Sequence, residues 1–182
     1  MFIAQNLKQT NIAEYLIYMW QIEDLIRAAE CDIDKLQTNF ISQYQVDNDE
    51  KEKLIQWYGD LITMMREEGV QEKGHLQICK NVIIALIDLH LQLLRSTKEP
   101  FYGAAYYKAL PYIVELRNKS GKKDESELET CFEALYGAML LRLQKKEISV
   151  ETAKALEVIA KFLSLLSNYY EKERNGDLKL DD

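Results

Sequence analysis

The chain has 182 residues, 47% of them hydrophobic and 29% charged, and its formal net charge is −7. This composition excludes a disordered chain, and seven glycines with two prolines are too few for a loop-rich all-β protein. The negative charge argues against nucleic acid or an anionic membrane surface as the main partner, because both require a basic face.

Apolar periodicity and capping signals predict an all-α fold of about seven helices. With their capping residues, the helices are expected at residues 12–29, 33–44, 47–68, 71–97, 100–121, 124–146 and 149–176. The connections between them are short, which favours antiparallel neighbours. We therefore expect a single-domain helical bundle over residues 1–176, with a frayed tail at 177–182. A solenoid of helical hairpins is the structural alternative.

Capping residues mark the ends of several of these helices. Asn11, with Glu14 three residues later, resembles a capping box at the start of the first helix. Gly69 is followed by an apolar residue, which predicts a Schellman ending for the third helix. Either Asp124 or Ser126 is expected to cap the sixth helix.

The cysteines indicate a reducing compartment. Cys31, Cys79 and Cys131 are far apart and form no CxxC spacing, which is typical of free thiols in a cytosol. The N-terminal residues lack the basic start and apolar run of a signal peptide. The longest apolar stretch, Val82–Leu94, is interrupted by polar residues and is too short to span a bilayer. We expect a cytoplasmic protein without a membrane segment.

The first predicted helix carries charges on two of its sides. At about 100° per residue, Glu14, Gln21 and Asp24 gather on one side and form a solvent-facing strip. Glu23 and Arg27 fall instead on the apolar side, four residues apart in the order that favours an ion pair. These two residues are therefore candidates for a semi-buried pair.

Two interpretations of this pair stay open. A semi-buried pair would mark a pocket wall, a helix contact or an interface, because burying charges is costly. At an edge position, Arg27 would lay its stem over Trp20 and expose its head. Replacing Arg27 by alanine would cost about 3–5 kcal/mol in the first case and about 0.3–0.5 kcal/mol in the second. We expect an intermediate loss of about 1–2 kcal/mol, with the Arg27 head meeting Glu23.

The stretch FIAQNLKQTNIAEYLIYMWQIEDLIRA, residues 2–28, is distinctive as a whole. It resembles the start of a family of uncharacterised helical proteins from Bacteroidetes, known only as a domain of unknown function. The resemblance implies that the family spans most of the chain. It implies no activity, cofactor or catalytic residue.

Two histidines give little basis for a metal site. Glu72–His75 is an E-x-x-H, half of the motif of carboxylate-bridged di-iron bundles, but His90 has no glutamate three residues before it. On one helix the two histidines would lie about 22 Å apart. No zinc spacing, P-loop, GxGxxG or GxSxG motif occurs. We predict no metal, no cofactor and no catalytic residue, and leave open whether the protein is an enzyme.

The most unusual segment is PFYGAAYYKALPYIVELR, Pro100–Arg117. It holds four tyrosines: Tyr102, Tyr106, Tyr107 and Tyr112. Pro111 removes an N–H and should kink the helix without ending it, because an apolar period continues beyond it. A free carbonyl beside several phenols would suit a small ligand. The alternative is a tyrosine-rich core helix with its hydroxyls at the surface.

Two functions follow from these features. The first is a non-enzymatic, cytoplasmic protein-interaction module, self-association included, because several helices carry more apolar surface than one stripe. The second is a small-molecule-binding protein or enzyme with a cleft near Pro111, whose polar groups would be Glu23, Arg27 and the four tyrosines. A transcriptional regulator is disfavoured, because the chain lacks a basic recognition helix.

Overall fold

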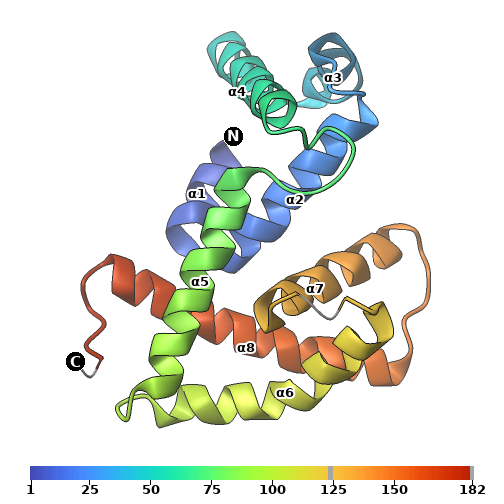
Figure 1. Cartoon of the computed structure of the whole chain (residues 1–182). Coiled ribbons are helices and arrows are strands. Elements are labelled where there is room, and N and C mark those ends of the chain that lie inside the picture. The colour runs from blue at the N-terminus through green and yellow to red at the C-terminus, as the bar shows by residue number, and fades with distance from the viewer. Residues whose placement is uncertain (123–124, 181–182) are drawn as a thin grey trace. The chain divides into compact units, whose positions relative to one another are not determined.

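The computed structural model describes residues 1–122 and 125–180, and the all-α prediction is confirmed within them (Figure 1). Its elements are α1 (Phe2–Thr10), α2 (Ile12–Ala28), α3 (Ile33–Asn39), η1 (Ile41–Gln43), α4 (Asn48–Glu67), α5 (Gln77–Arg95), α6 (Pro100–Ser120), α7 (Glu127–Leu143) and α8 (Val150–Arg174). Helix α1 is an addition to the predicted helices, and the predicted helix at 33–44 is divided into α3 and a 3₁₀ turn.

The chain groups into two compact units, which are described separately. Unit 1 contains Met1–Lys8 and Glu14–Asn81, and unit 2 contains Gln9–Ala13 and the chain from Val82 onward. The helical fold is thus established, while the predicted limits of one domain at 1–176 stay a prediction.

In unit 1, α3 packs against α4 and η1 around buried apolar side chains. The Asp47 side chain accepts a hydrogen bond from the Glu50 N–H at 2.8 Å and so caps α4. The Schellman ending of α4 is also confirmed: Gly69 has a φ of +67°, and the Val70 N–H donates to the Met65 carbonyl at 2.9 Å.

The start of the fourth predicted helix is wrong. α5 begins at Gln77 rather than near residue 71, and a loop occupies the interval. Gly74 in this loop has a φ of +86°, a left-handed conformation that interrupts an α-helix. His75 therefore lies in a loop, and Glu72–His75 is not a helical E-x-x-H.

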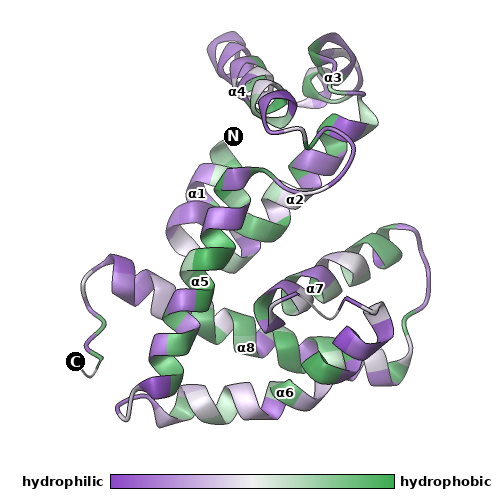
Figure 2. Ribbon diagram, in the orientation of Figure 1, coloured by the Kyte–Doolittle hydropathy of each residue, from purple (hydrophilic) through white to green (hydrophobic). Residues whose placement is uncertain are grey.

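Helix α5 has 19 residues and is mostly hydrophobic, as its colouring in Figure 2 shows. By length and composition it is the one helix among the described residues that could cross a membrane. The expectation that this stretch is too short to span was based on Val82–Leu94 alone and does not hold for the whole helix. Core helices of soluble proteins have the same character, so the absence of a membrane segment stays a prediction.

In unit 2, α6 packs against α7 and α8, and α7 packs against α8. Ser126 caps α7 in a capping box with Glu129, while Asp124 lies outside the described residues. Tyr102, Phe132 and Phe162 are fully buried in the core of this unit. Three long helices thus enclose one aromatic-rich core.

Helix α6 continues through Pro111, as predicted. Pro100 occupies its first turn, and Gly121 ends it with a φ of +73°. Figure 1 shows the helix changing direction along its second half. The lost N–H and the ring of Pro111 are a sufficient cause for such a bend.

Candidate functional site

Glu23 on α2 is a fully buried carboxylate in unit 1, with 0% of its surface exposed. Its Oε1 accepts a hydrogen bond from the Leu76 N–H at 2.9 Å, and its Oε2 lies 2.6 Å from Nδ1 of His75. An ionised carboxylate can only accept, so Nδ1 of His75 carries the proton and donates it. The carboxylate therefore holds the loop that precedes α5.

An aromatic stack completes this arrangement. The rings of His75 and buried Trp20 have centroids 4.1 Å apart and planes inclined by 15°. The imidazole is thereby fixed by a ring on its face and a carboxylate on its edge. Burial, together with the charge of Glu23, raises the pKa of the Cys79 thiol, which stays protonated and unreactive.

Arg27 is half of the predicted pair, but Glu23 is not its main partner. Its Nη1 donates to Asp24 Oδ1 at 2.8 Å, and its Nη2 donates to the carbonyls of Val70, at 3.1 Å, and Gly74. Glu23 lies farther away, with 3.9 Å between Oε2 and Nη2. The arginine side chain is 16% exposed and ties α2 to the loop after α4.

One expectation for this helix needs correction. Asp24 has 44% of its side chain exposed, as expected for a solvent-facing strip, and it also forms the closest ion pair of Arg27, three residues away on the helix. The head of Arg27 was expected to meet Glu23, whose oxygens are instead taken by His75 and Leu76. The carboxylate is buried, but its partners come from a loop.

The Glu23 cluster, which we define as Trp20, Glu23, Arg27 and His75, is arranged to join chain segments. Two hydrogen bonds of Arg27 and two of Glu23 link α2 to the loop between α4 and α5. Within residues 1–122 and 125–180, no three His, Cys, Asp or Glu side chains are grouped closely enough to hold a metal ion. The predicted lack of a metal or cofactor stays a prediction.

The four tyrosines of α6, all in unit 2, have different environments. Tyr102 is fully buried, and its oxygen lies 2.6 Å from Nδ1 of His90. Tyr106 is nearly buried and donates from its hydroxyl to Glu127 Oε2 at 2.6 Å. Burial is the main cause that raises the pKa of both phenols, and the Glu127 carboxylate adds to it for Tyr106. Both remain protonated at neutral pH.

Tyr107 and Tyr112 are not buried beside Tyr102 and Tyr106. Tyr107 is 66% exposed, and Tyr112 is half-buried. Tyr106 lines a cavity whose other walls come from α5 and the start of α7, and Pro111 is not among the residues that line it. This cavity is therefore not the cleft expected beside the proline, which stays a prediction, and the four phenols do not share its lining.

The stability of unit 2 should depend on pH, because His90 is a buried titratable group. The side chain is 5% exposed, and burial lowers its pKa below the ordinary 6.5, although the charge of Glu127 opposes the shift. The unfolded chain binds the proton more readily, so the native state loses stability as pH falls below 6.5. We expect a loss of up to about 1.4 kcal/mol per pH unit in urea unfolding. A His90→Gln variant should lose that part of the slope, and an unchanged slope would contradict this account.

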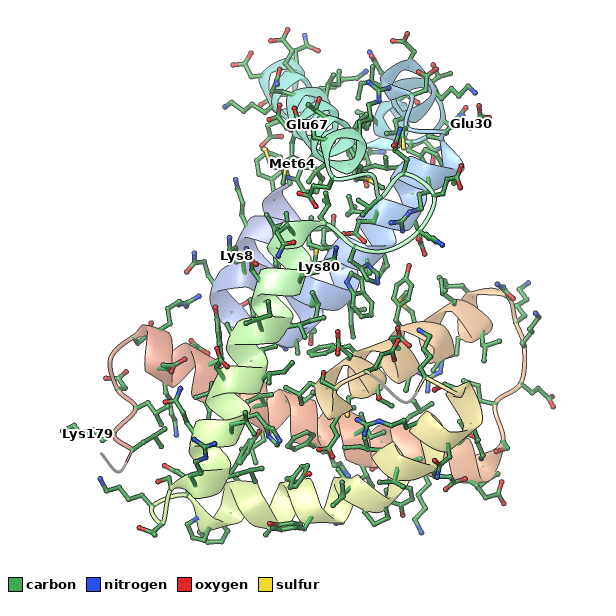
Figure 3. All side chains as sticks on the ribbon, viewed as in Figure 1. Lys8, Glu30, Met64, Glu67, Lys80 and Lys179 are labelled. Carbon is green, nitrogen blue, oxygen red and sulfur yellow. The ribbon has the colours of Figure 1, made fainter. Side chains whose placement is uncertain are left out.

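One face of α6 exposes apolar side chains at helical spacing. The α6 face consists of Phe101, Ala104, Tyr107, Lys108, Pro111 and Val114, all exposed. Phe101 is the extreme case, with 83% of its surface exposed. Figure 3 shows side chains that project from α6 on the side away from α7 and α8. Such a row on one helix is unusual for a surface without a partner.

The sequence could have indicated parts of this arrangement. The residues of the α6 face have a regular spacing within one helix, so helical periodicity applied to residues 101–114 would have found them. The partnership of Glu23 and His75 links residues 52 positions apart and had no local signal. His90 is an isolated histidine in the sequence, and its partner Tyr102 is 12 positions away.

Comparison with known proteins gives a family and no activity. No curated protein and no solved structure matches the chain. Residues 1–177 match the family model described as "Domain of unknown function (DUF4924)". The predicted resemblance is thereby confirmed, whereas an origin in Bacteroidetes stays a prediction. Because the match covers nearly the whole sequence, the chain belongs to the DUF4924 family of domains of unknown function.

Proposed function

We propose that the chain is a non-enzymatic interaction module that pairs with a second copy of itself through the α6 face. The observation that carries this proposal is the exposure of large apolar side chains on that face, 83% for Phe101 and 66% for Tyr107. The positions of the α6 face, 101, 104, 107, 108, 111 and 114, follow the ordinary helical spacing, so the row keeps its spacing when the helix direction is reversed. A surface of this kind is self-complementary when two helices pack antiparallel about a two-fold axis.

The symmetry defines which residues would meet. With the axis between residues 107 and 108, Phe101 lies opposite Val114 of the second copy, and Ala104 lies opposite Pro111. Large side chains meet at the two ends, and small ones leave room for a close approach beside the centre. Two α6 faces therefore suit each other in shape as well as in polarity.

The central pair adds a polar contact. Tyr107 would lie opposite Lys108 of the second copy, where the lysine stem covers the ring and the ammonium group lies near its face. One helix face is smaller than a standard interface, so we expect association in the micromolar range or weaker.

A cysteine pair tests this register directly. We expect the double variant Phe101→Cys with Val114→Cys to form a disulfide-linked dimer under mild oxidation, because both pairs of thiols would be apposed. Each single variant should remain uncrosslinked, since equivalent residues of the two copies would be about 20 Å apart along the helices. Non-reducing electrophoresis provides the measurement. The native thiols, Cys31, Cys79 and Cys131, are buried and should not react.

A matched control uses two exposed positions with the same separation on another helix. Glu151→Cys with Ser164→Cys on α8 places two thiols 13 residues apart on surface that the proposal does not use. Crosslinking of this control, or of the Phe101→Cys single variant, to the same extent as the test pair would count against the proposed register.

The proposal also covers the cellular location and the classes of partner that we do not expect the protein to bind. We place the protein in the cytoplasm, supported by three buried cysteines that are all free thiols. A net charge of −7 supports a protein partner over nucleic acid or an anionic membrane surface. The alternative of small-molecule binding has a separate observation in its favour, which concerns the cavity beside Tyr106.

A further inference from the structure

Unit 2 contains a cavity of about 300 Å³ between α5, α6 and the start of α7. Four aliphatic side chains form its apolar walls: Ile87, Leu91, Leu94 and Leu128. Four side chains capable of polar interactions reach it as well: His90, Tyr106, Ser126 and Glu127. A cavity of this size is at the lower end of the range for small-ligand sites, and such sites combine apolar walls with a few polar groups.

The polar groups of this cavity are already oriented. Tyr106 donates its hydroxyl to Glu127 Oε2, which fixes the carboxylate and leaves Oε1 to accept another hydrogen bond. The Tyr102 hydroxyl and Nδ1 of His90 form a hydrogen bond of 2.6 Å, which fixes the orientation of the imidazole. The cavity thus has one charged acceptor and one neutral ring.

We propose that this cavity binds a small primary amine with an apolar body. The ammonium group would pair with the Glu127 carboxylate and lie against the ring of Tyr106, while the body would fill the aliphatic walls. This site is separate from the α6 face, and it would operate in a monomer or in a dimer.

The charge of the cavity lining favours a cationic ligand over an anionic or a neutral one. Glu127 is the only acidic or basic side chain, histidine apart, among the described residues that line the cavity, so an anion would meet a negative wall. Arg117 is the nearby cation that acts on Tyr106, but it is not among the lining residues. A neutral ligand would gain the apolar contacts without the ion pair. A cation is therefore the favoured occupant.

Three probes of similar shape and different charge test the assignment: 2-phenylethylamine, 2-phenylethanol and phenylacetate. By calorimetry or ligand-detected NMR, we expect the amine to bind about tenfold more tightly than the alcohol and phenylacetate to bind least. In Glu127→Gln, the preference for the amine over the alcohol should disappear. Glu151→Gln, which changes an equivalent first-turn carboxylate of α8, should leave it intact.

Imidazole NMR locates the bound probe, because the chain has only two histidines. With the resonances assigned from a His75→Gln variant, the amine should shift the His90 signals and leave those of His75 unchanged. Equal binding of amine and alcohol, no amine binding at millimolar concentration, or an amine preference that survives Glu127→Gln would each overturn the proposal.

Discussion

Replacing Glu23 by alanine is expected to lower the free energy of unfolding of unit 1 by about 3–5 kcal/mol. The change removes the acceptor for the Leu76 N–H and for the His75 ring, and leaves Arg27 without its nearest buried carboxylate. Buried donors without partners account for most of this loss. Urea titration followed by tryptophan fluorescence measures it specifically, because both tryptophans, Trp20 and Trp57, belong to unit 1.

Two comparisons make the Glu23 result interpretable. Arg27→Ala should cost only about 1–2 kcal/mol, because Glu23 keeps its His75 and Leu76 donors when the arginine is removed. Glu52→Ala, at an exposed position of α4, should change stability by less than about 0.5 kcal/mol. A Glu23→Ala loss no larger than that of Glu52→Ala would mean that the buried carboxylate does not organise the loop before α5.

Tyr102→Ala is expected to destabilise unit 2 by about 3–5 kcal/mol. The ring is fully buried, contacts the aromatic rings of Phe162 and Tyr169, and is hydrogen-bonded to His90. Its removal creates a cavity and leaves the imidazole without a partner for Nδ1. Far-UV circular dichroism during urea unfolding is the appropriate measurement, because the tryptophans do not report on this unit.

Tyr107→Ala on the same helix is the matched control for Tyr102. Its side chain is mostly exposed, so the change should alter the free energy of unfolding by less than about 0.5 kcal/mol. It should instead weaken self-association, because Tyr107 lies at the centre of the α6 face. If the two alanine variants lost equal stability, the distinction between a structural tyrosine and a surface tyrosine on α6 would be wrong.

Much of the secondary structure could be predicted because its signals are local. Asp47, Ser126 and Gly69 act within one helical turn, and the structure places each at the predicted helix end. Helix α1 has only nine residues, more than half of them polar, which is too short for a secure helix prediction from sequence alone. The early start assigned to α5 ignored the loop at Gly74, which is held by Arg27 and is followed by residues that contact buried Glu23.

The candidate sites were harder to predict from the sequence than the helices, for a physical reason. The Glu23 cluster depends on contacts across more than 40 positions, and periodicity within one helix cannot identify such partners. The prediction of one lining for the four tyrosines rests on their closeness in sequence. On a helix, however, Tyr102 and Tyr106 share a side, whereas Tyr107 points about 100° away from Tyr106. That difference separates the core of unit 2 from the α6 face.

The mass of the protein in solution as a function of concentration tests the central claim most directly. In light scattering from about 10 to 500 μM, the mass should rise from that of one chain toward that of two, consistent with micromolar or weaker pairing. Tyr107→Glu, which places a charge at the centre of the α6 face, should remain at the mass of one chain throughout. A wild-type protein that is monomeric over the whole range, or a dimer that Tyr107→Glu does not disturb, would contradict pairing through α6.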